Sequence, residues 1–176
     1  DSEEEKKAAD LESLVDKELN DEIGTLTVEW RRSFTSESNI GNWAADVLRE
    51  FAGTDIALVN SGTLRKNMLP GAIRKRDMWQ MFPFNNTFVT FTVGGETLKH
   101  MLEWQAAGKG EFMQVSGLRY LYDPEKPVGS KVVSAYVNNT PIDLKGRYTI
   151  ATNNYVGGHL TEHLGVFTQG VTLRDL

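Results

Sequence analysis

The sequence has no cysteine, and its 176 residues include only three histidines. The missing cysteines exclude disulfides, thiolate metal ligands and cysteine nucleophiles. No apolar run reaches the roughly 18 residues that a membrane-spanning helix needs. The formal net charge of −5 disfavours a broad nucleic-acid-binding face. We therefore expect no nucleic-acid partner and no membrane span in this chain.

Familiar catalytic patterns are missing as well. The sequence shows no Ser-His-Asp arrangement, no phosphate loop of the Walker type and no pair of carboxylates that suits acid–base catalysis. His159 and His163 are spaced like two metal ligands on a helix, but Gly157, Gly158 and Gly165 make a stable helix doubtful. We favour solvated histidines over a metal site, and we assign neither a catalytic residue nor a metal ligand.

The composition is that of an ordinary globular protein, with 40% apolar and 24% charged residues. The sequence opens without a methionine or a signal-peptide pattern, and we interpret it as a mature or excised fragment. Apolar periodicity predicts helices over residues 3–19, 39–51, 76–82 and 96–107. Strands are expected over residues 23–30, 56–59, 87–93, 131–137 and 147–152, with two more inside 111–123 and a hairpin turn at Asn138 and Asn139. This mixture predicts an α+β or mixed α/β fold of layered sheets with flanking helices.

The most informative stretch is the apolar run 56–59 and the polar loop that follows it. A short apolar run bounded by turn residues is typical of a strand that is buried on both faces. In the loop, Asn60 can donate and accept hydrogen bonds, and Gly62 allows close approach to the backbone. Arg65 adds a planar cation that suits phosphate or carboxylate. The alternative interpretation is an ordinary turn with a solvated arginine.

Two aromatic residues stand among turn formers. Phe84 lies between Pro83 and Asn85, and Tyr155 lies in a stretch, 153–158, that we expect to be a loop at a strand end. Two aromatic rings on loops can hold a planar ligand such as a nucleobase between them. The alternative, which these residues alone favour, is that each ring fills its own loop.

Five segments together change this assessment, and they occur in the order Ser36-Glu37-Ser38-Asn39-Ile40-Gly41-Asn42, Asn60-Ser61-Gly62-Thr63-Leu64-Arg65, Pro83-Phe84-Asn85-Asn86-Thr87, Gln114-Val115-Ser116-Gly117-Leu118-Arg119-Tyr120 and Ala151-Thr152-Asn153-Asn154-Tyr155. Together they closely resemble the C-terminal domain of the 5′-nucleotidase family, which includes periplasmic UDP-sugar hydrolases and ecto-5′-nucleotidases. The resemblance covers nearly the whole chain. It implies a linker-like N-terminal helix over residues 1–24 and a substrate-binding domain over residues 25–176.

The resemblance also implies the substrate-binding residues, which are Asn60, Gly62, Arg65, Phe84, Gly117 and Tyr155. Phe84 and Tyr155 match the two rings that hold the base, and Tyr155 stands where the family commonly has phenylalanine. Asn60 matches a residue that contacts base or ribose, and Arg65 one on the phosphate side. Gly117 is expected in the pocket wall. Asn39 and Asn42 are expected to have a mainly structural role.

In that family, catalysis belongs to an N-terminal metallophosphoesterase domain with two divalent metal ions. The resemblance therefore implies that this chain recognises a nucleotide or nucleotide sugar for a 5′-nucleotidase-like phosphohydrolase. It also implies that the chain is inactive alone, holds no cofactor itself and has the metal domain of the same parent chain as its partner. The implied location of the parent is periplasmic, secreted or at the cell surface.

The sequence departs from the family pattern, and two of the departures concern the expected pocket. Ser61 and Thr63 replace glycines of the Asn-Gly-Gly-Gly-Ile-Arg segment, and residues 157–160 read Gly-Gly-His-Leu where the family has a Gly-Gly-Asp-Gly type of segment. The missing aspartate is the residue that holds the ribose hydroxyls in the family. An alternative function is therefore a non-catalytic binding module of the cell envelope with a degenerate nucleotide pocket.

Overall fold

The computed structural model describes residues 2–164, which are built around a four-stranded mixed sheet. The strand order is β4 (Phe88–Gly94), β9 (Arg147–Asn153), β2 (Ile56–Asn60) and β5 (Met113–Ser116). The central strands β9 and β2 run parallel, and each outer strand is antiparallel to its neighbour. All five residues of β2 are buried, which confirms the strand that the apolar run predicted.

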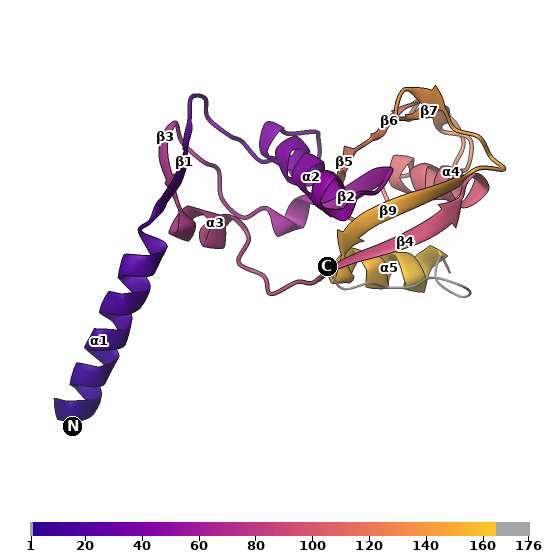
Figure 1. Cartoon of the computed structure of the whole chain (residues 1–176). Helices are drawn as coiled ribbons and strands as arrows, with labels where there is room; N and C mark the ends of the chain where they lie inside the picture. The colour runs from indigo at the N-terminus through magenta and orange to yellow at the C-terminus, as the bar shows by residue number, and fades with distance from the viewer. Residues whose placement is uncertain (1, 165–176) are drawn as a thin grey trace.

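Helices cover both faces of this sheet. Figure 1 shows α2 (Asn39–Ala52) and α5 (Asn154–Leu164) on opposite sides of it. Alternation along β2 produces two cores, because successive side chains of a strand point to opposite faces. Ile56 and Leu58 pack in the core formed with α5 and with α4 (Gly95–Ala106), while Ala57 and Val59 pack in the core formed with α2. The predicted fold of layered sheets with flanking helices is confirmed.

Both ends of helix α2 are fixed by residues that lie next to the helix in the chain. The Ser38 hydroxyl accepts a hydrogen bond from the Gly41 N–H at 3.2 Å, which is the usual N-cap interaction. Gly53 ends the helix in the left-handed conformation with φ of 63°. The buried face consists of residues three or four apart, namely Ile40, Ala44 and Leu48.

A second, three-stranded sheet lies beside the four-stranded one. It contains β6 (Leu118–Tyr122), β7 (Val132–Val137) and β8 (Thr140–Pro141) in that order. The β7–β8 turn has positive φ angles of 48° at Asn138 and 66° at Asn139. Two such angles are typical of a type I′ hairpin turn, and the predicted hairpin is confirmed.

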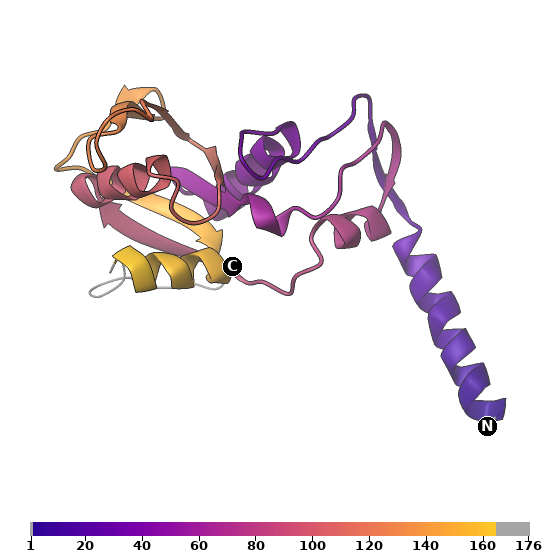
Figure 2. The same cartoon turned by 180° about the vertical axis from the view of Figure 1, so that it is seen from behind.

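The N-terminal part forms a small separate layer. Helix α1 (Ser2–Leu19) leads into β1 (Glu22–Leu26), which pairs with β3 (Gly71–Arg74), and α3 (Lys75–Met81) follows. Figure 2 shows these elements to one side of the four-stranded sheet, with α1 extending away from the rest. The strand expected over 23–30 ends early because its partner β3 is only four residues long.

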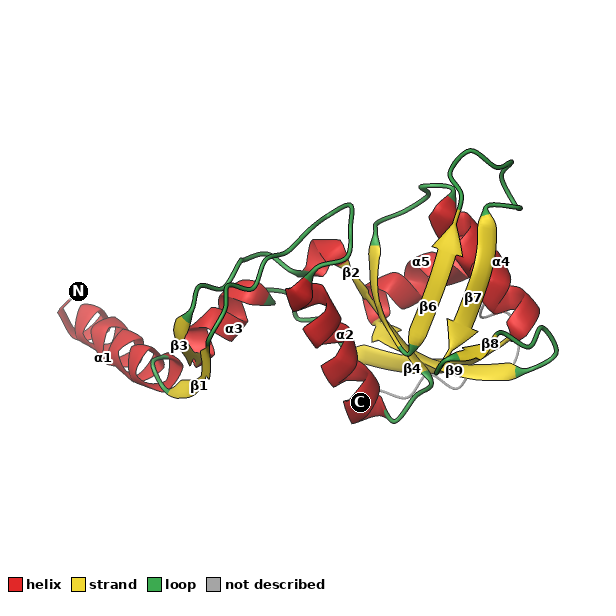
Figure 3. Cartoon of the chain, turned by 90° about the horizontal axis from the view of Figure 1, so that it is seen from above, coloured by secondary structure: helices red, strands yellow, loops and turns green. Residues whose placement is uncertain are grey.

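The prediction of a loop over residues 153–158 was wrong, because helix α5 begins at Asn154. The Asn153 side-chain oxygen accepts from the Val156 N–H at 2.8 Å and so caps the helix. Val156 and Leu160 lie one helical turn apart and are both buried in the core against the sheet. Figure 3 shows where α5 lies relative to the strands. Gly157 allows this close packing, since a Cβ there would lie 3.2 Å from Val89.

Candidate functional site

The parallel strands β2 and β9 bring two asparagines together at their carboxyl ends. Asn60 ends β2, Asn153 ends β9, and Asn153 Nδ2 donates to Asn60 Oδ1 at 2.9 Å. The Thr63 hydroxyl donates to the same oxygen. Asn60 is only 3% exposed, and both acceptor positions of its Oδ1 are occupied. Its side chain can therefore offer a ligand only an N–H, and one of the two N–H groups already donates to Glu111 at 2.8 Å.

The antiparallel pairing of β4 and β9 brings the two predicted aromatic rings to the same corner. Phe88 at the start of β4 pairs with Asn153 at the end of β9. Just outside the strands, Thr87 and Asn154 exchange hydrogen bonds of 2.9 and 3.2 Å. Phe84 precedes this junction and Tyr155 follows it, so residues 71 positions apart in the chain become neighbours of one pocket.

That pocket has a volume of about 230 Å³, and its lining includes five of the six predicted substrate-binding residues. The lining residues are Asn60, Gly62, Thr63, Arg65, Phe84, Asn86, Glu111 and Tyr155. The two rings are 48% and 47% exposed, so their faces are accessible from solvent. Both rings therefore line one pocket, with part of each side chain open to solvent.

Arg65 supplies the positive charge of the pocket. Its Nη1 donates to the Gly62 carbonyl oxygen at 3.3 Å, and its guanidinium carbon lies 5.7 Å from the centre of the Phe84 ring. The residue is exposed, and the contact with Phe84 places its planar group beside the aromatic wall. Several N–H donors of the guanidinium remain for an anion such as phosphate.

The pocket also contains a carboxylate that the sequence analysis missed. Glu111 accepts hydrogen bonds from Asn60 Nδ2 at 2.8 Å, from the Gly62 N–H at 3.1 Å and from the Tyr155 hydroxyl at 3.1 Å. A Cβ on Gly62 would lie 2.2 Å from Glu111 Oε2, so the missing side chain of this glycine makes room for the carboxylate. No local signal in the sequence marks Glu111, which simply follows the turn at residues 108–110.

Gly117 lies outside this pocket, in contrast to its expected place in the wall. It connects β5 and β6 with a φ of +72°, and a Cβ there would lie 2.0 Å from the Asp55 carbonyl oxygen. The positive φ and the close backbone contact each favour glycine. Its role in this structure is to let the chain turn from one sheet to the next.

The two residues that replace family glycines are both hydrogen-bonded. Ser61 Oγ accepts from Gln114 Nε2 at 2.8 Å, and Thr63 donates to Asn60 as described above. The same Gln114 accepts from the Ser38 N–H at 3.0 Å and so connects this loop to the start of α2. The hydrogen bonds of Ser61 and Thr63 fix the conformation of this loop, whereas glycines at the two positions would leave its backbone more flexible.

The asparagines at the start of α2 have structural partners, as expected. Asn39 Oδ1 accepts from the Arg31 N–H at 2.8 Å, and its Nδ2 donates to the Glu29 carbonyl at 2.9 Å. Asn42 Nδ2 donates to Glu37 at 2.7 Å. These bonds tie the loop before α2 to the first turn of the helix.

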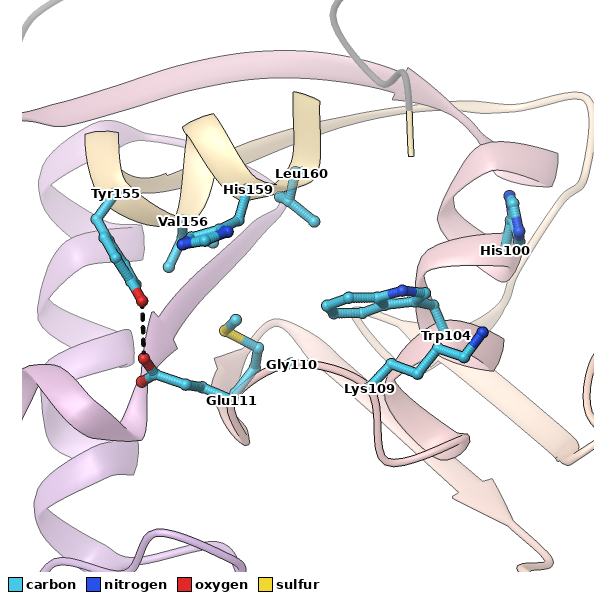
Figure 4. Close-up of a pocket in the computed structure, with 10 residues that line it drawn as sticks. His100, Trp104, Lys109, Gly110, Glu111, Tyr155, Val156, His159 and Leu160 are labelled. Carbon is cyan, nitrogen blue, oxygen red and sulfur yellow. Dashed lines mark hydrogen bonds between the residues drawn. The ribbon is translucent and has the colours of Figure 1, made fainter. Parts of the chain in front are cut away.

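Tyr155 separates the pocket from a larger cavity of about 770 Å³, shown in Figure 4. The pKa of its phenol is raised, first by the hydrogen bond that it donates to Glu111, then by burial and by the negative charge of that carboxylate. The Tyr155 and His159 rings pack edge to face, with 4.6 Å between their centroids. Trp104 and Lys109 lie across the cavity from these residues.

Among the side chains that the structure describes within residues 2–164, no three histidines, aspartates or glutamates are grouped so that they could hold a metal ion. In the same part of the chain, no helix combines the length and the apolar character that crossing a membrane requires.

Comparison with known proteins points to one protein family. Residues 22–167 match the family described as 5′-nucleotidase, C-terminal domain. The chain is 30% identical over 155 residues to the trifunctional nucleotide phosphoesterase protein YfkN of Bacillus subtilis, an alignment that covers 81% of the chain and 10% of that protein. It is 32% identical over 128 residues to the NAD 5′-nucleotidase of Haemophilus influenzae, which covers 65% of the chain and 21% of that protein.

Solved structures show the same fold. The crystal structure of a 5′-nucleotidase precursor from Thermus thermophilus superimposes with a TM-score of 0.78 at 29% identity, over 93% of this chain and 35% of that one. The NAD nucleotidase of H. influenzae gives a TM-score of 0.79 at 24% identity, over 99% of this chain and 36% of that one. The family match covers most of the sequence, and the structural match extends over nearly all of it. The chain therefore belongs to the 5′-nucleotidase C-terminal domain family.

Proposed function

We propose that this chain recognises the nucleotide for a 5′-nucleotidase-type phosphohydrolase, by holding the base between Phe84 and Tyr155. The observation that carries the proposal is the single pocket into which the fold brings Asn60, Arg65 and both rings. Stacking on an aromatic side chain contributes about 1–3 kcal/mol per base and tolerates different bases. Two rings with a neighbouring cation therefore suit a nucleotide or a nucleotide sugar.

Arg65 gives the bound nucleotide its direction. Its guanidinium is exposed at the pocket and can form charge-assisted hydrogen bonds with a phosphate group. Stacking at one end and an ionic contact at the other would fix the position of the phosphate relative to the protein. Such positioning accelerates a reaction by reducing the freedom of the substrate before the chemical step.

We assign the hydrolysis itself to a metallophosphoesterase domain elsewhere in a longer parent protein. The described residues offer no site for its two metal ions, and the chain spans only 10% and 21% of the two curated relatives described above. The proposal is therefore that this domain binds and orients the substrate, while another domain of a longer parent supplies the metal ions.

Calorimetric titration of the chain with AMP and with adenosine tests this function. Phe84→Ala is expected to weaken both ligands by about 1–3 kcal/mol, because both contain the stacked base. Arg65→Ala is expected to weaken AMP but not adenosine, which lacks the phosphate. Trp79→Ala is the control, since Trp79 is an exposed aromatic residue on α3 outside the pocket. Equal affinity of AMP for the wild type and Phe84→Ala would contradict the proposal.

One observation favours a second candidate, a binding module with a degenerate nucleotide pocket. Residues 157–160 belong to helix α5 and contain no aspartate to hold the ribose hydroxyls. This candidate predicts that no nucleotide or nucleotide sugar raises the unfolding temperature of the chain. A dose-dependent rise with AMP or UDP-glucose that Phe84→Ala removes would reject it, because a ligand that binds the folded state stabilises that state.

A further inference from the structure

The candidate pocket has a positive and a negative group on the two sides of one residue, Gly62. The Gly62 carbonyl oxygen accepts from Arg65 at 3.3 Å, while its N–H donates to Glu111 at 3.1 Å. Gly62 lies in a short 3₁₀ turn, where the N–H and C=O of a residue point in roughly opposite directions. A nucleotide with its phosphate toward Arg65 therefore presents the far edge of its base toward Glu111.

Glu111 is held in place by neutral donors. Asn60 and Gly62 both donate to Oε2, and the Tyr155 hydroxyl donates to Oε1. An amide, a backbone N–H and a phenol fix the carboxylate without neutralising its charge. Because Oε1 has one such bond, it can accept another from a ligand.

Asn60, which donates to Glu111, does not compete with it for the same role. Asn60 Oδ1 already accepts from Thr63 and Asn153, so Asn60 can offer a ligand only an N–H. Among the side chains that line this pocket, Glu111 is the one that carries a negative charge and so is the strongest acceptor for an N–H of the base. Figure 4 shows Glu111 hydrogen-bonded to Tyr155 at the border of the larger cavity, where a group projecting from the base edge has room.

We propose that Glu111 determines base specificity by selecting nucleobases that present an amino group to its carboxylate. This inference rests on the proposed function and adds a preference within it. An amino N–H donates to a carboxylate, the same pairing by which acidic side chains recognise cytosine. A carbonyl oxygen at that position would face a negative charge without a hydrogen between them. A base without either group would leave the acceptor without a ligand partner.

The test compares AMP with purine ribonucleoside 5′-monophosphate, which has the same ring system and phosphate but no exocyclic amino group. Calorimetry with the wild-type chain is expected to show AMP bound about tenfold tighter or more, since the lost hydrogen bond involves a charged partner. Equal affinities of the two ligands in the wild type would overturn the proposal, and this arm requires no substitution in the pocket.

Glu111→Gln changes the acceptor while preserving the network around it. The glutamine oxygen can accept from Asn60 and Gly62, and its amide can donate to the Tyr155 oxygen. The preference for AMP is expected to fall to about twofold or less, because the amide offers a ligand a donor in place of the charged acceptor. Glu125→Gln, the same change at an exposed turn residue, is expected to leave the preference unchanged. A tenfold preference that survives in Glu111→Gln would overturn the assignment to Glu111.

Phe84→Ala separates a failure of this inference from a failure of the proposed function. If both nucleotides bind the wild type equally and Phe84→Ala weakens both, the base clamp stands and the Glu111 preference is wrong. If Phe84→Ala weakens neither, the clamp is wrong, and the preference that depends on it is wrong too.

Discussion

Thr87 and Asn154 exchange two hydrogen bonds at the corner of the central sheet. The Asn154 N–H donates to the Thr87 carbonyl at 2.9 Å, and the Thr87 N–H donates to Asn154 Oδ1 at 3.2 Å. This pair extends the antiparallel pairing of β4 and β9 beyond the strands themselves. It fixes the segment that carries Phe84 to the start of the helix that carries Tyr155, and so it sets the distance between the two rings.

Loss of the Asn154 side chain should therefore disturb ligand binding more than folding. Asn154→Ala removes the longer of the two bonds and keeps the backbone bond. We expect a stability loss of about 0.5–1.5 kcal/mol by urea unfolding, which is usual for one hydrogen bond, together with weaker AMP binding. Asn85→Ala, at an exposed position in the same corner, serves as the control. AMP affinity that is unchanged in Asn154→Ala would show that this bond does not position the rings.

Asn153 should be more important for stability, because it both caps α5 and bonds to Asn60. Asn153→Ala removes the cap to Val156 and leaves Asn60 Oδ1 with one partner fewer. Loss of a cap and of a buried hydrogen bond predicts a cost of about 2–4 kcal/mol in urea unfolding. Asn153→Asp keeps the oxygen that caps α5 but loses the N–H that donates to Asn60. We therefore expect it to destabilise the protein less than Asn153→Ala does, through the lost bond to Asn60 alone. An Asn153→Ala cost below that of Asn154→Ala would contradict the capping role.

Gly117 and Gly129 offer a matched pair for backbone strain. Both have positive φ angles, +72° and +86°, but only at Gly117 would a Cβ meet a backbone atom, at 2.0 Å. Gly129→Ala is expected to cost about 1–2 kcal/mol from conformation alone. Gly117→Ala should cost clearly more in the same unfolding measurement, with AMP affinity retained wherever the protein is folded. A selective loss of AMP affinity at unchanged stability would instead return Gly117 to the binding site.

The pKa of the Tyr155 phenol reports on its hydrogen bond to Glu111. Its pKa is raised above the usual tyrosine value of about 10, chiefly because the protonated phenol donates to Glu111. The resulting stabilisation is fully present below that usual value and disappears as pH rises through the raised pKa. The absorbance difference between wild type and Tyr155→Phe near 295 nm reports this titration. Glu111→Gln should lower the pKa toward the usual value, and an unchanged pKa would show that Glu111 is not the cause.

The features that could be predicted from the sequence are those that depend on residues close together in the chain. The run 56–59 became a strand buried on both faces because its residues are apolar at every position. The helix predicted over residues 39–51 from apolar periodicity is α2, whose buried residues recur three or four positions apart. Phe84 and Tyr155 were selected because they stand among turn formers, and the resemblance to a known family connected them with Asn60 and Arg65.

The features that the sequence did not predict depend on contacts across the fold. Helix α5 contains two glycines that suggest a loop, but burial of Val156 and Leu160 against the sheet stabilises it. Glu111 acquires its role from Asn60 and Gly62, which are 51 and 49 positions away in the chain. No local pattern at 108–112 shows that this carboxylate will face a pocket built by other segments.

The most direct test of the account is an amide-shift titration of the chain with AMP by NMR. We expect saturable shifts that concentrate in residues 60–65, in residues 84–86 and around Tyr155, with little change in the β6–β7–β8 sheet. Phe84→Ala should weaken the titration by about 1–3 kcal/mol. Shifts that saturate elsewhere on the protein, or no shifts at AMP concentrations that saturate a weak site, would contradict a nucleotide pocket between Phe84 and Tyr155.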